Sequence, residues 1–322
     1  MKPFLALLIA ALSASLASAG DNKKDDPSQI GNRDVGKGVN FYSIEKEIAL
    51  GKQLAEEVQR QAKAVDDPLI SEYVNRVCQN LARNSDAKVP ITCRVIEGES
   101  PNAFALPGGY IFIYTGLIKM ADEEDEFAGA LAHEIAHVAA RHMTRQATKG
   151  QIASIASIPV AILLGGSWTG YAIRQGAGAA IPMAFLKFSR SDESEADYLG
   201  VQYMYAAGYD PSGLITDFEK LDALQRKKPG AVQQIFSTHP MDSTRIEKVQ
   251  AEIQKILPAK DEYVITTSDY SDMRERLMSM LDRRKTTEKD DRPHLRVKPG
   301  SGAPDQQDGD QRPTIKRREL ID

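Results

Sequence analysis

Two histidines and a glutamate stand close together in the middle of the chain, in the sequence HEIAH at residues 133–137. On a helix, His133 and His137 are about 40° apart around the axis and about 6 Å apart along it, so both imidazoles can reach one metal ion. Glu134 then lies beside that ion and can take a proton from the attacking water instead of binding the metal. The spacing therefore predicts zinc-assisted hydrolysis.

A charged surface helix can carry the same residues by chance, and Glu134 would then pair with Arg141 or Lys119 in solvent. The neighbouring residues favour a buried helix instead, because many are small and apolar: Ala128, Ala130, Ala132, Ala136, Ala139 and Ala140. A buried polar group without a partner costs about 1–3 kcal/mol, and a buried charge costs more. A zinc ion would supply that partner.

A catalytic zinc ion usually has three protein ligands and one open position, so a third ligand must be found. One known pattern places a histidine six residues after the second ligand, but that position holds Met143, and the glycine of the pattern is Ala140. On a continuing helix His142 faces about 140° away from His137, so we expect a surface or outer-layer group there. The third ligand must come from another segment.

Three stretches together resemble metallopeptidase family forty-eight: HEIAH, SRSDESEAD at residues 189–197 and STHP at residues 237–240. That family includes HtpX, the CAAX prenyl protease of the Ste type and BepA-like periplasmic proteases. The resemblance extends to the stretch NAFALPGG, which begins at Asn102. It implies a gluzincin-type peptidase domain with one Zn²⁺ per chain. We see no internal repeats, so the chain is most similar to a soluble periplasmic branch without a helical-repeat domain.

Matching the family motif S-R-x-x-E-x-x-A-D residue by residue makes Glu193, and not Glu195, the third zinc ligand. Asp197 follows four residues later on the same helical face, where a carboxylate can orient a ligand histidine. The alternative for Glu193 is a solvated charge among many.

The resemblance places His239, the histidine of the T-H-P motif, over the open side of the metal. An imidazole there can stabilise the oxyanion of a tetrahedral intermediate, so His239 is a catalytic candidate beside Glu134. It can also cap the zinc ion and keep the enzyme latent. A third interpretation is that His239 only caps the helix that starts near Asp242.

The first 19 residues have one lysine, an apolar run and a small-residue cleavage site, which predicts a secretory signal peptide. No cysteine follows that site to accept a lipid, so we expect a periplasmic or secreted protein; an uncleaved anchor is the alternative. Residues 20–40 are polar and predict a flexible leader, and residues 283–322 predict a disordered tail. The peptidase domain then spans residues 41–282.

The net charge of −4 offers no electrostatic reason to expect nucleic-acid binding. The two cysteines, Cys78 and Cys93, would lie in a compartment where a disulfide persists, but two buried thiols are equally compatible with the sequence. Helical periodicity over residues 43–65 and 68–83 predicts two helices, which we expect to pack as an antiparallel pair.

Residues 91–96 and 102–114 are rich in strand-forming residues, so the fold class is mainly α with a small β-sheet (α+β). A strand beside the metal can bind extended substrate by strand addition, which makes Asn102 and Ala103 candidates for substrate contact. Asn102 serving only the turn is the alternative. Residues 151–188 are apolar but interrupted by glycine and proline; they predict a lid, a peripheral contact with a membrane, or ordinary core helices.

We therefore predict a zinc metalloendopeptidase of the cell envelope that hydrolyses misfolded or misassembled envelope proteins. An envelope-protein chaperone or assembly factor with a latent zinc site is the alternative. A zinc hydrolase acting on peptidoglycan stem peptides is a third hypothesis. The predicted partners are unfolded envelope polypeptides, and no pattern indicates an oligomeric state.

Overall fold

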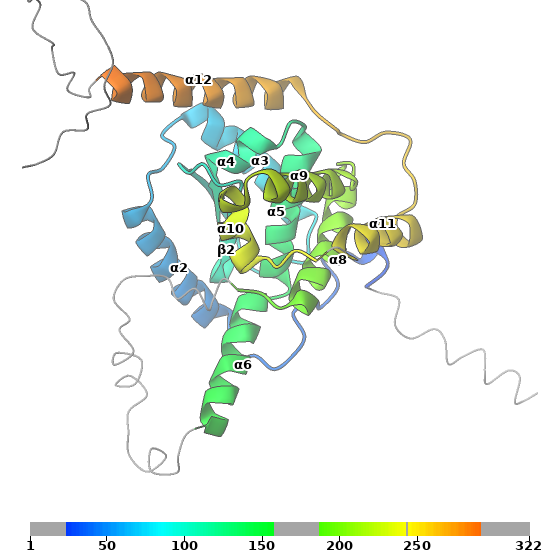
Figure 1. The fold of residues 1–322 in the computed structure, drawn as a ribbon. Helices are drawn as coiled ribbons and strands as arrows, with labels where there is room; N and C mark the ends of the chain where they lie inside the picture. Colours follow the sequence, from blue (N-terminus) through cyan, green and yellow to red (C-terminus); the bar gives the residue numbers. More distant parts are fainter. Residues whose placement is uncertain (1–23, 158–186, 243, 291–322) are drawn as a thin grey trace, which may run out of the picture. The chain divides into compact units, whose positions relative to one another are not determined.

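The computed structural model of the chain describes residues 24–157, 187–242 and 244–290 (Figure 1). Helix α5 (Glu124–Ala139) carries the HEIAH sequence and contacts α3 (Pro68–Arg83), α8 (Arg190–Ala207), α9 (Gly213–Lys227) and strand β2 (Ala103–Leu106). Nearly all of its side chains are buried, as its alanine-rich sequence predicted. Acidic residues occupy its first turn, where the helix dipole stabilises negative charge.

A sheet of three strands lies beside α5, in the order β1 (Thr92–Ile96), β3 (Tyr110–Tyr114), β2. Strand β1 runs parallel to β3, and β2 pairs antiparallel with β3 through the short turn η2 (Pro107–Gly109). Gly108 and Gly109 have φ angles of 74° and 93°, a left-handed conformation that favours glycine. The predicted strand, turn and strand of residues 102–114 are confirmed, and so is the α+β class.

Helices α2 (Ile44–Gln61) and α3 form where the periodicity predicted them, with Ser43 and Asp67 as their N-caps. Their predicted antiparallel pairing is wrong. Helix α2 packs on the face of the sheet that carries Phe104 and Phe112, whereas α3 and α5 pack on the opposite face. Successive side chains of a strand point to opposite faces, so the short sheet separates the two helices.

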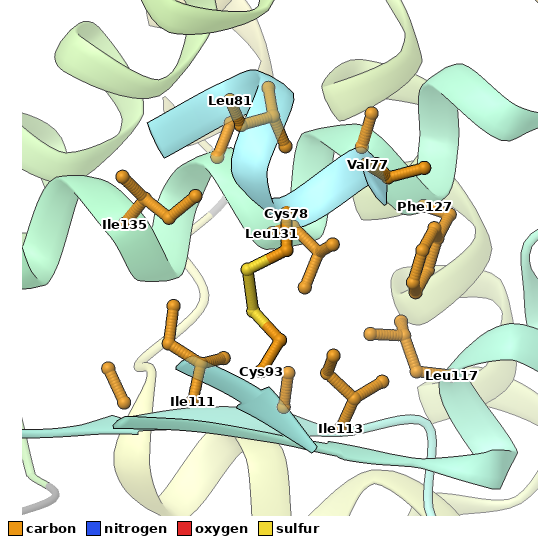
Figure 2. Close-up of a cluster of buried hydrophobic side chains, with 14 of the residues drawn as sticks. Val77, Cys78, Leu81, Cys93, Ile111, Ile113, Leu117, Phe127, Leu131 and Ile135 are labelled. Atoms are coloured by element: carbon orange, nitrogen blue, oxygen red, sulfur yellow. A yellow bond between two sulfur atoms is a disulfide. The ribbon is translucent and has the colours of Figure 1, made fainter. Parts of the chain in front are cut away.

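Cys78 of α3 and Cys93 of β1 form a disulfide, which resolves the alternative that the sequence left open (Figure 2). Both residues are buried in the main hydrophobic core, among Leu131 and Ile135 of α5 and Ile111 of β3. The bond therefore joins the sheet covalently to a helix that contacts α5.

Six further elements are described. They are η1 (Pro27–Gln29), α4 (Thr115–Met120), α6 (His142–Ser157), α10 (Pro229–Thr238), α11 (Thr244–Ile256) and α12 (Ser268–Asp290). Residues 1–281 form one contact unit and residues 282–322 a second, of which only the end of α12 is described.

The segment before α2 makes side-chain contacts with the helical core. Arg33 is buried and donates hydrogen bonds to Asp86 (3.0 and 2.7 Å) and to Gln202 of α8 (2.6 Å). Within the described residues, no helix combines the length and the apolarity needed to cross a bilayer. Most of residues 151–188, for which we predicted a lid, a membrane contact or core helices, lies outside the described residues.

Candidate metal centre

The first two donors of the site come from adjacent turns of α5. The Nε2 atoms of His133 and His137 lie 3.0 Å apart, and the two residues are 6% and 0% exposed. Both nitrogens therefore face the same buried point, as the four-residue spacing requires.

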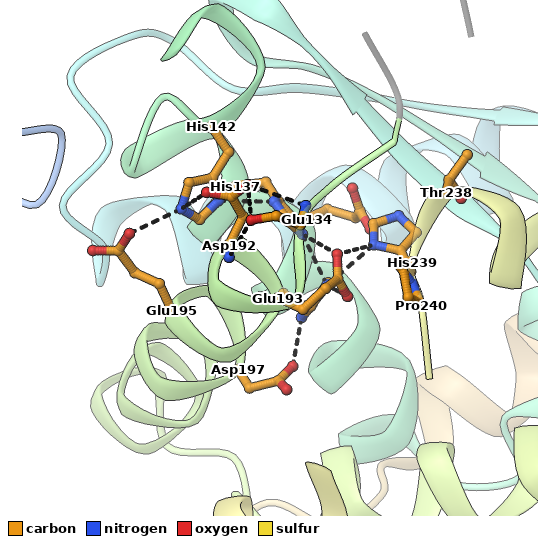
Figure 3. A network of polar contacts seen from close by, with 12 residues as sticks. Glu134, His137, His142, Asp192, Glu193, Glu195, Asp197, Thr238, His239 and Pro240 are labelled. Atoms are coloured by element: carbon orange, nitrogen blue, oxygen red, sulfur yellow. Dashed lines mark hydrogen bonds and ion pairs between the residues drawn. The ribbon is translucent and has the colours of Figure 1, made fainter. Parts of the chain in front are cut away.

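The third donor comes from α8. Ser189 caps this helix together with Asp192 in a capping box, and Glu193 follows in the first turn. Its carboxylate oxygens lie 3.4 Å from His137 Nε2 and 3.5 Å from His133 Nε2. The structure thus brings Glu193 against both histidines, whereas Glu195 points elsewhere (Figure 3).

His239, at the C-terminal end of α10, provides a fourth donor. Its Nδ1 lies 3.1 Å from Glu193 Oε1 and 3.4 Å from His133 Nε2. The backbone of the residue is fixed because its N–H donates to the carbonyl of Ile235 at 2.7 Å. His239 is therefore part of the buried cluster and does not serve merely as a helix cap at the surface.

The four side chains fit a metal ion. Each of His133, His137, Glu193 and His239 offers one ligand atom, and these atoms lie within 4.8 Å of one another. Nitrogen and carboxylate donors bound to tetrahedral zinc at about 2.0–2.1 Å lie about 3.3 Å apart, close to the 3.0, 3.4 and 3.5 Å separations found here. Three imidazoles packed around one carboxylate form a donor set that suits zinc.

Glu134 is buried on α5 between His133 and His137 in sequence, and its carboxylate lies beside the donor cluster. Its Oε2 accepts a hydrogen bond from the backbone N–H of Ala105 at 2.8 Å, and its Oε1 lies 3.4 Å from His239 Nε2. Burial raises the pKa of Glu134 above its ordinary value, although His239 and His133 act in the opposite direction. A carboxylate with a raised pKa is a better proton acceptor.

Asp197 and Arg245 form a second layer of contacts around the donors His133 and Glu193. Asp197 Oδ1 lies 2.9 Å from His133 Nδ1, so it can hold the ring nitrogen that faces away from the cluster. Arg245 donates two hydrogen bonds to Asp197, at 2.8 and 2.6 Å, and its Nη1 lies 3.0 Å from Glu193 Oε2. Burial acts to raise the pKa of Asp197, but Arg245 and His133 outweigh it and lower that pKa.

The two predicted substrate contacts lie at the start of β2, an edge strand in the described part of the chain. Ala103 lines an apolar pocket that also reaches His133, Glu134 and His239. The side chain of Asn102 is buried, and its Oδ1 has no hydrogen-bond partner among the described residues. The structure therefore brings Ala103 to the site, while the Asn102 Oδ1 makes no hydrogen bond to the donors within the described residues.

The apolar pocket is walled by α5, α9 and α10. Its further lining residues are Leu117, Ala130, Leu214, Asp217, Phe218, Leu221, Ile235, Phe236, Met241 and Arg245.

Sequence reasoning missed the contact of Glu195 with His142, and of its two alternatives for His142, a surface or an outer-layer group, the structure shows the second. We expected His142 to face away from His137 because we assumed that the helix continues, but α5 ends at Ala139 and α6 begins at His142. Arg141 between them has a φ angle of 56°. Neither glycine nor proline marks this break. The sequence signal that remains is the basic pair Arg141-His142, because basic residues are common at the C-terminal end of a helix.

The chain matches known peptidases over most of the described region. The profile of Peptidase family M48 matches residues 68–253. The beta-barrel assembly-enhancing protease of Yersinia pestis is 26% identical over 84% of this chain and 56% of its own length. The mitochondrial metalloendopeptidase OMA1 of Schizosaccharomyces pombe is 36% identical over 55% of this chain and 51% of its own length. The metalloprotease LoiP of Escherichia coli is 28% identical over 60% and 75% of the two chains.

The matched part of the beta-barrel assembly-enhancing proteases is limited. The chain spans little more than half of their length, 56% in Yersinia pestis and 53% in Escherichia coli. The residues matched by the family profile, 68–253, contain all four donors.

Proposed function

Because the chain belongs to peptidase family M48, we propose that it is a zinc-dependent metalloendopeptidase of the cell envelope that hydrolyses misfolded or misassembled proteins. The observation that carries the proposal is the buried cluster of His133, His137, Glu193 and His239 with Glu134 beside it. The names of the relatives, a beta-barrel assembly-enhancing protease among them, support the substrate class.

His133, His137 and Glu193 would hold the zinc ion. When bound, zinc would polarise the scissile carbonyl and lower the pKa of water toward about 7. Glu134 takes a proton from the attacking water and returns it to the leaving amine. The hydrogen bond from Ala105 aims the Glu134 carboxylate, and Asp197 keeps His133 in the orientation that presents Nε2 to the metal.

Strand β2 supplies a template for the substrate backbone. The N–H of Tyr114 donates to the carbonyl of Asn102 at 2.9 Å, so the backbone groups of Asn102 and Phe104 face β3. Backbone groups alternate along a strand, so those of Ala103 and Ala105 face the edge of β2 opposite β3, where Ala105 N–H already meets Glu134. Ala103 would pair with an extended substrate, and Asn102, the residue before it, would contact the same substrate.

The Cys78–Cys93 disulfide supports a periplasmic or secreted location, because such bonds persist in oxidising compartments. The signal peptide proposed for residues 1–19 would deliver the chain there.

One observation favours a second candidate, an envelope chaperone or assembly factor with a latent zinc site. His239 Nδ1 lies among the donors, where it would fill the position that water needs. Such a protein would bind polypeptides without cleaving them until His239 is displaced.

Metal reconstitution tests the proposal. The purified protein, stripped with a chelator, should lose cleavage of unfolded casein and regain it when one equivalent of zinc per chain is restored. Magnesium, which prefers oxygen ligands, should not restore it. Cleavage that persists in the stripped protein would refute zinc dependence, and full zinc binding without any cleavage would favour the latent binder.

A further inference from the structure

Two side chains outside the donor cluster are lined up behind His137. The Nδ1 atoms of His142 and His137 lie 2.9 Å apart, and His142 Nε2 lies 3.1 Å from Glu195 Oε2 (Figure 3). The His142 side chain is 0% exposed and that of Glu195 is 27% exposed. The line of side chains His137–His142–Glu195 therefore runs from a buried donor to a partly exposed carboxylate.

The distances allow only one arrangement of protons when His137 binds a metal. Its Nε2 faces the cluster without a proton, so its Nδ1 carries the proton and donates it to His142. His142 Nδ1 must then accept, which leaves the proton of a neutral His142 on Nε2, where it is donated to Glu195. Each member of the line fixes the tautomer of the next.

The backbone is bent to make this contact. Arg141 adopts a φ angle of 56°, which is uncommon for a residue other than glycine. Its side chain holds the bend, because Nε donates to Glu47 at 2.8 Å and Nη2 donates to the carbonyl of Tyr42 at 2.7 Å. Without the bend, His142 would continue on α5 and face away from His137.

The other neighbours of these side chains do not determine which nitrogen of His137 carries the proton. Phe188 stacks on His137 with ring centroids 3.8 Å apart, which fixes the tilt of the ring but not its protonation. Arg145 lies 3.2 Å from Glu195 and keeps that carboxylate in place. His133, by contrast, meets its carboxylate Asp197 directly.

We infer that His142, held by Glu195, is a positioning residue that orients His137 and raises the affinity of the cluster for its metal ion. The inference rests on the proposed function, because it assumes that His137 is a ligand. Groups that orient ligand histidines typically contribute about 10- to 100-fold in metal affinity.

Two substitutions of similar size separate positioning from packing. His142→Asn keeps a carbonyl oxygen near the place of Nδ1, so it can still accept from His137. His142→Leu fills the space but offers no acceptor. The zinc dissociation constant, measured by competition with a chromophoric chelator, should rise about 10- to 100-fold in His142→Leu and stay near the wild-type value in His142→Asn. A packing role would leave His142→Leu the better of the two.

A third substitution covers the possibility that His142→Leu unfolds, which urea denaturation of the metal-free proteins will show. Glu195→Ala removes the partly exposed carboxylate together with its ion pairs to Arg145 and Lys24, and should weaken zinc binding several-fold. Lys24→Ala is its control, because Lys24 approaches Glu195 at 3.8 Å from the solvent and should leave the affinity unchanged.

The outcomes separate this inference from the proposed function. If wild type binds zinc and both His142→Leu and Glu195→Ala bind it equally well, the positioning role is refuted and the proposed function stands. A wild-type protein that binds no zinc would overturn both.

Discussion

At Glu193, one buried carboxylate meets four other side chains: His133, His137, His239 and Arg245 all have a nitrogen within 3.5 Å of its oxygens. Burial acts to raise the pKa of Glu193, but His239, His133 and His137 outweigh it and hold the pKa well below its usual range. The carboxylate therefore stays ionised, as a metal ligand must.

The His239 imidazole determines whether water can take the fourth coordination position of the metal. Three donors remain when its imidazole is removed, so His239→Ala should retain zinc and cleave casein faster than wild type, because water gains the fourth position. Zinc content by atomic absorption and initial cleavage rates check this. Slower cleavage with full zinc would instead assign His239 to stabilisation of the intermediate.

Arg245 neutralises two buried carboxylates, so its loss should be costly. Arg245→Met should lower the free energy of unfolding by about 3–5 kcal/mol, because it leaves Asp197 and Glu193 without their cation. Arg276→Met is the matched control; Arg276 pairs with Asp67 at the surface and should change stability by no more than about 1 kcal/mol. Equal effects in urea denaturation would contradict the account.

At the scale of elements, the sequence predicted single helices and strands but not the packing of segments that are far apart in the chain. Periodicity and caps located α2 and α3, and strand-forming residues around the Pro-Gly-Gly turn located β2 and β3. The separation of α2 from α3 depends on a sheet formed later in the chain, which no local pattern encodes. The break at Arg141 depends on Glu47, far away in sequence.

In the site, too, the residues on one helix could be predicted from local spacing, and those on other elements could not. The spacing within α5 indicated His133, Glu134 and His137, because a helix converts four residues into one face. Glu193 and His239 were assigned from a motif resemblance, since neither spacing nor composition joins them to α5. The supporting contact from Ala105 arises only when β2 packs on α5.

The disulfide should contribute to stability through the elements it joins. It closes a loop with a sequence separation of 15, for which the chain-entropy model predicts about 3 kcal/mol. The double substitution Cys78→Ala and Cys93→Ala should lower the free energy of unfolding by about that amount. A reductant should destabilise wild type in urea denaturation but leave the double variant unchanged. An equal response of both proteins would contradict the assignment.

At the scale of the whole molecule, stability should depend on pH because carboxyls are buried on several helices. Burial is the main cause that raises the pKa to about 7 in Asp125 of α5, Asp217 of α9 and Glu252 of α11. A group with a raised folded-state pKa contributes stability that is fully present below its unfolded pKa. That contribution is lost as the pH rises through about 7.

Asp125 offers the simplest test of this dependence, because it lies in the first turn of α5 and not among the metal donors. Asp125→Asn cannot ionise, so its free energy of unfolding should fall less than that of wild type between pH 5 and about pH 8. Urea denaturation across this range measures both slopes. Parallel slopes would show that Asp125 is ionised throughout.

We propose that Glu134 acts as the base beside a zinc ion held by its neighbours. The most direct measurement compares casein cleavage and zinc content in wild type and Glu134→Gln, which preserves size and the acceptor for Ala105. We predict equal zinc in both proteins and loss of cleavage in the variant alone. A Glu134→Gln protein that binds zinc and cleaves casein as fast as wild type would contradict the account.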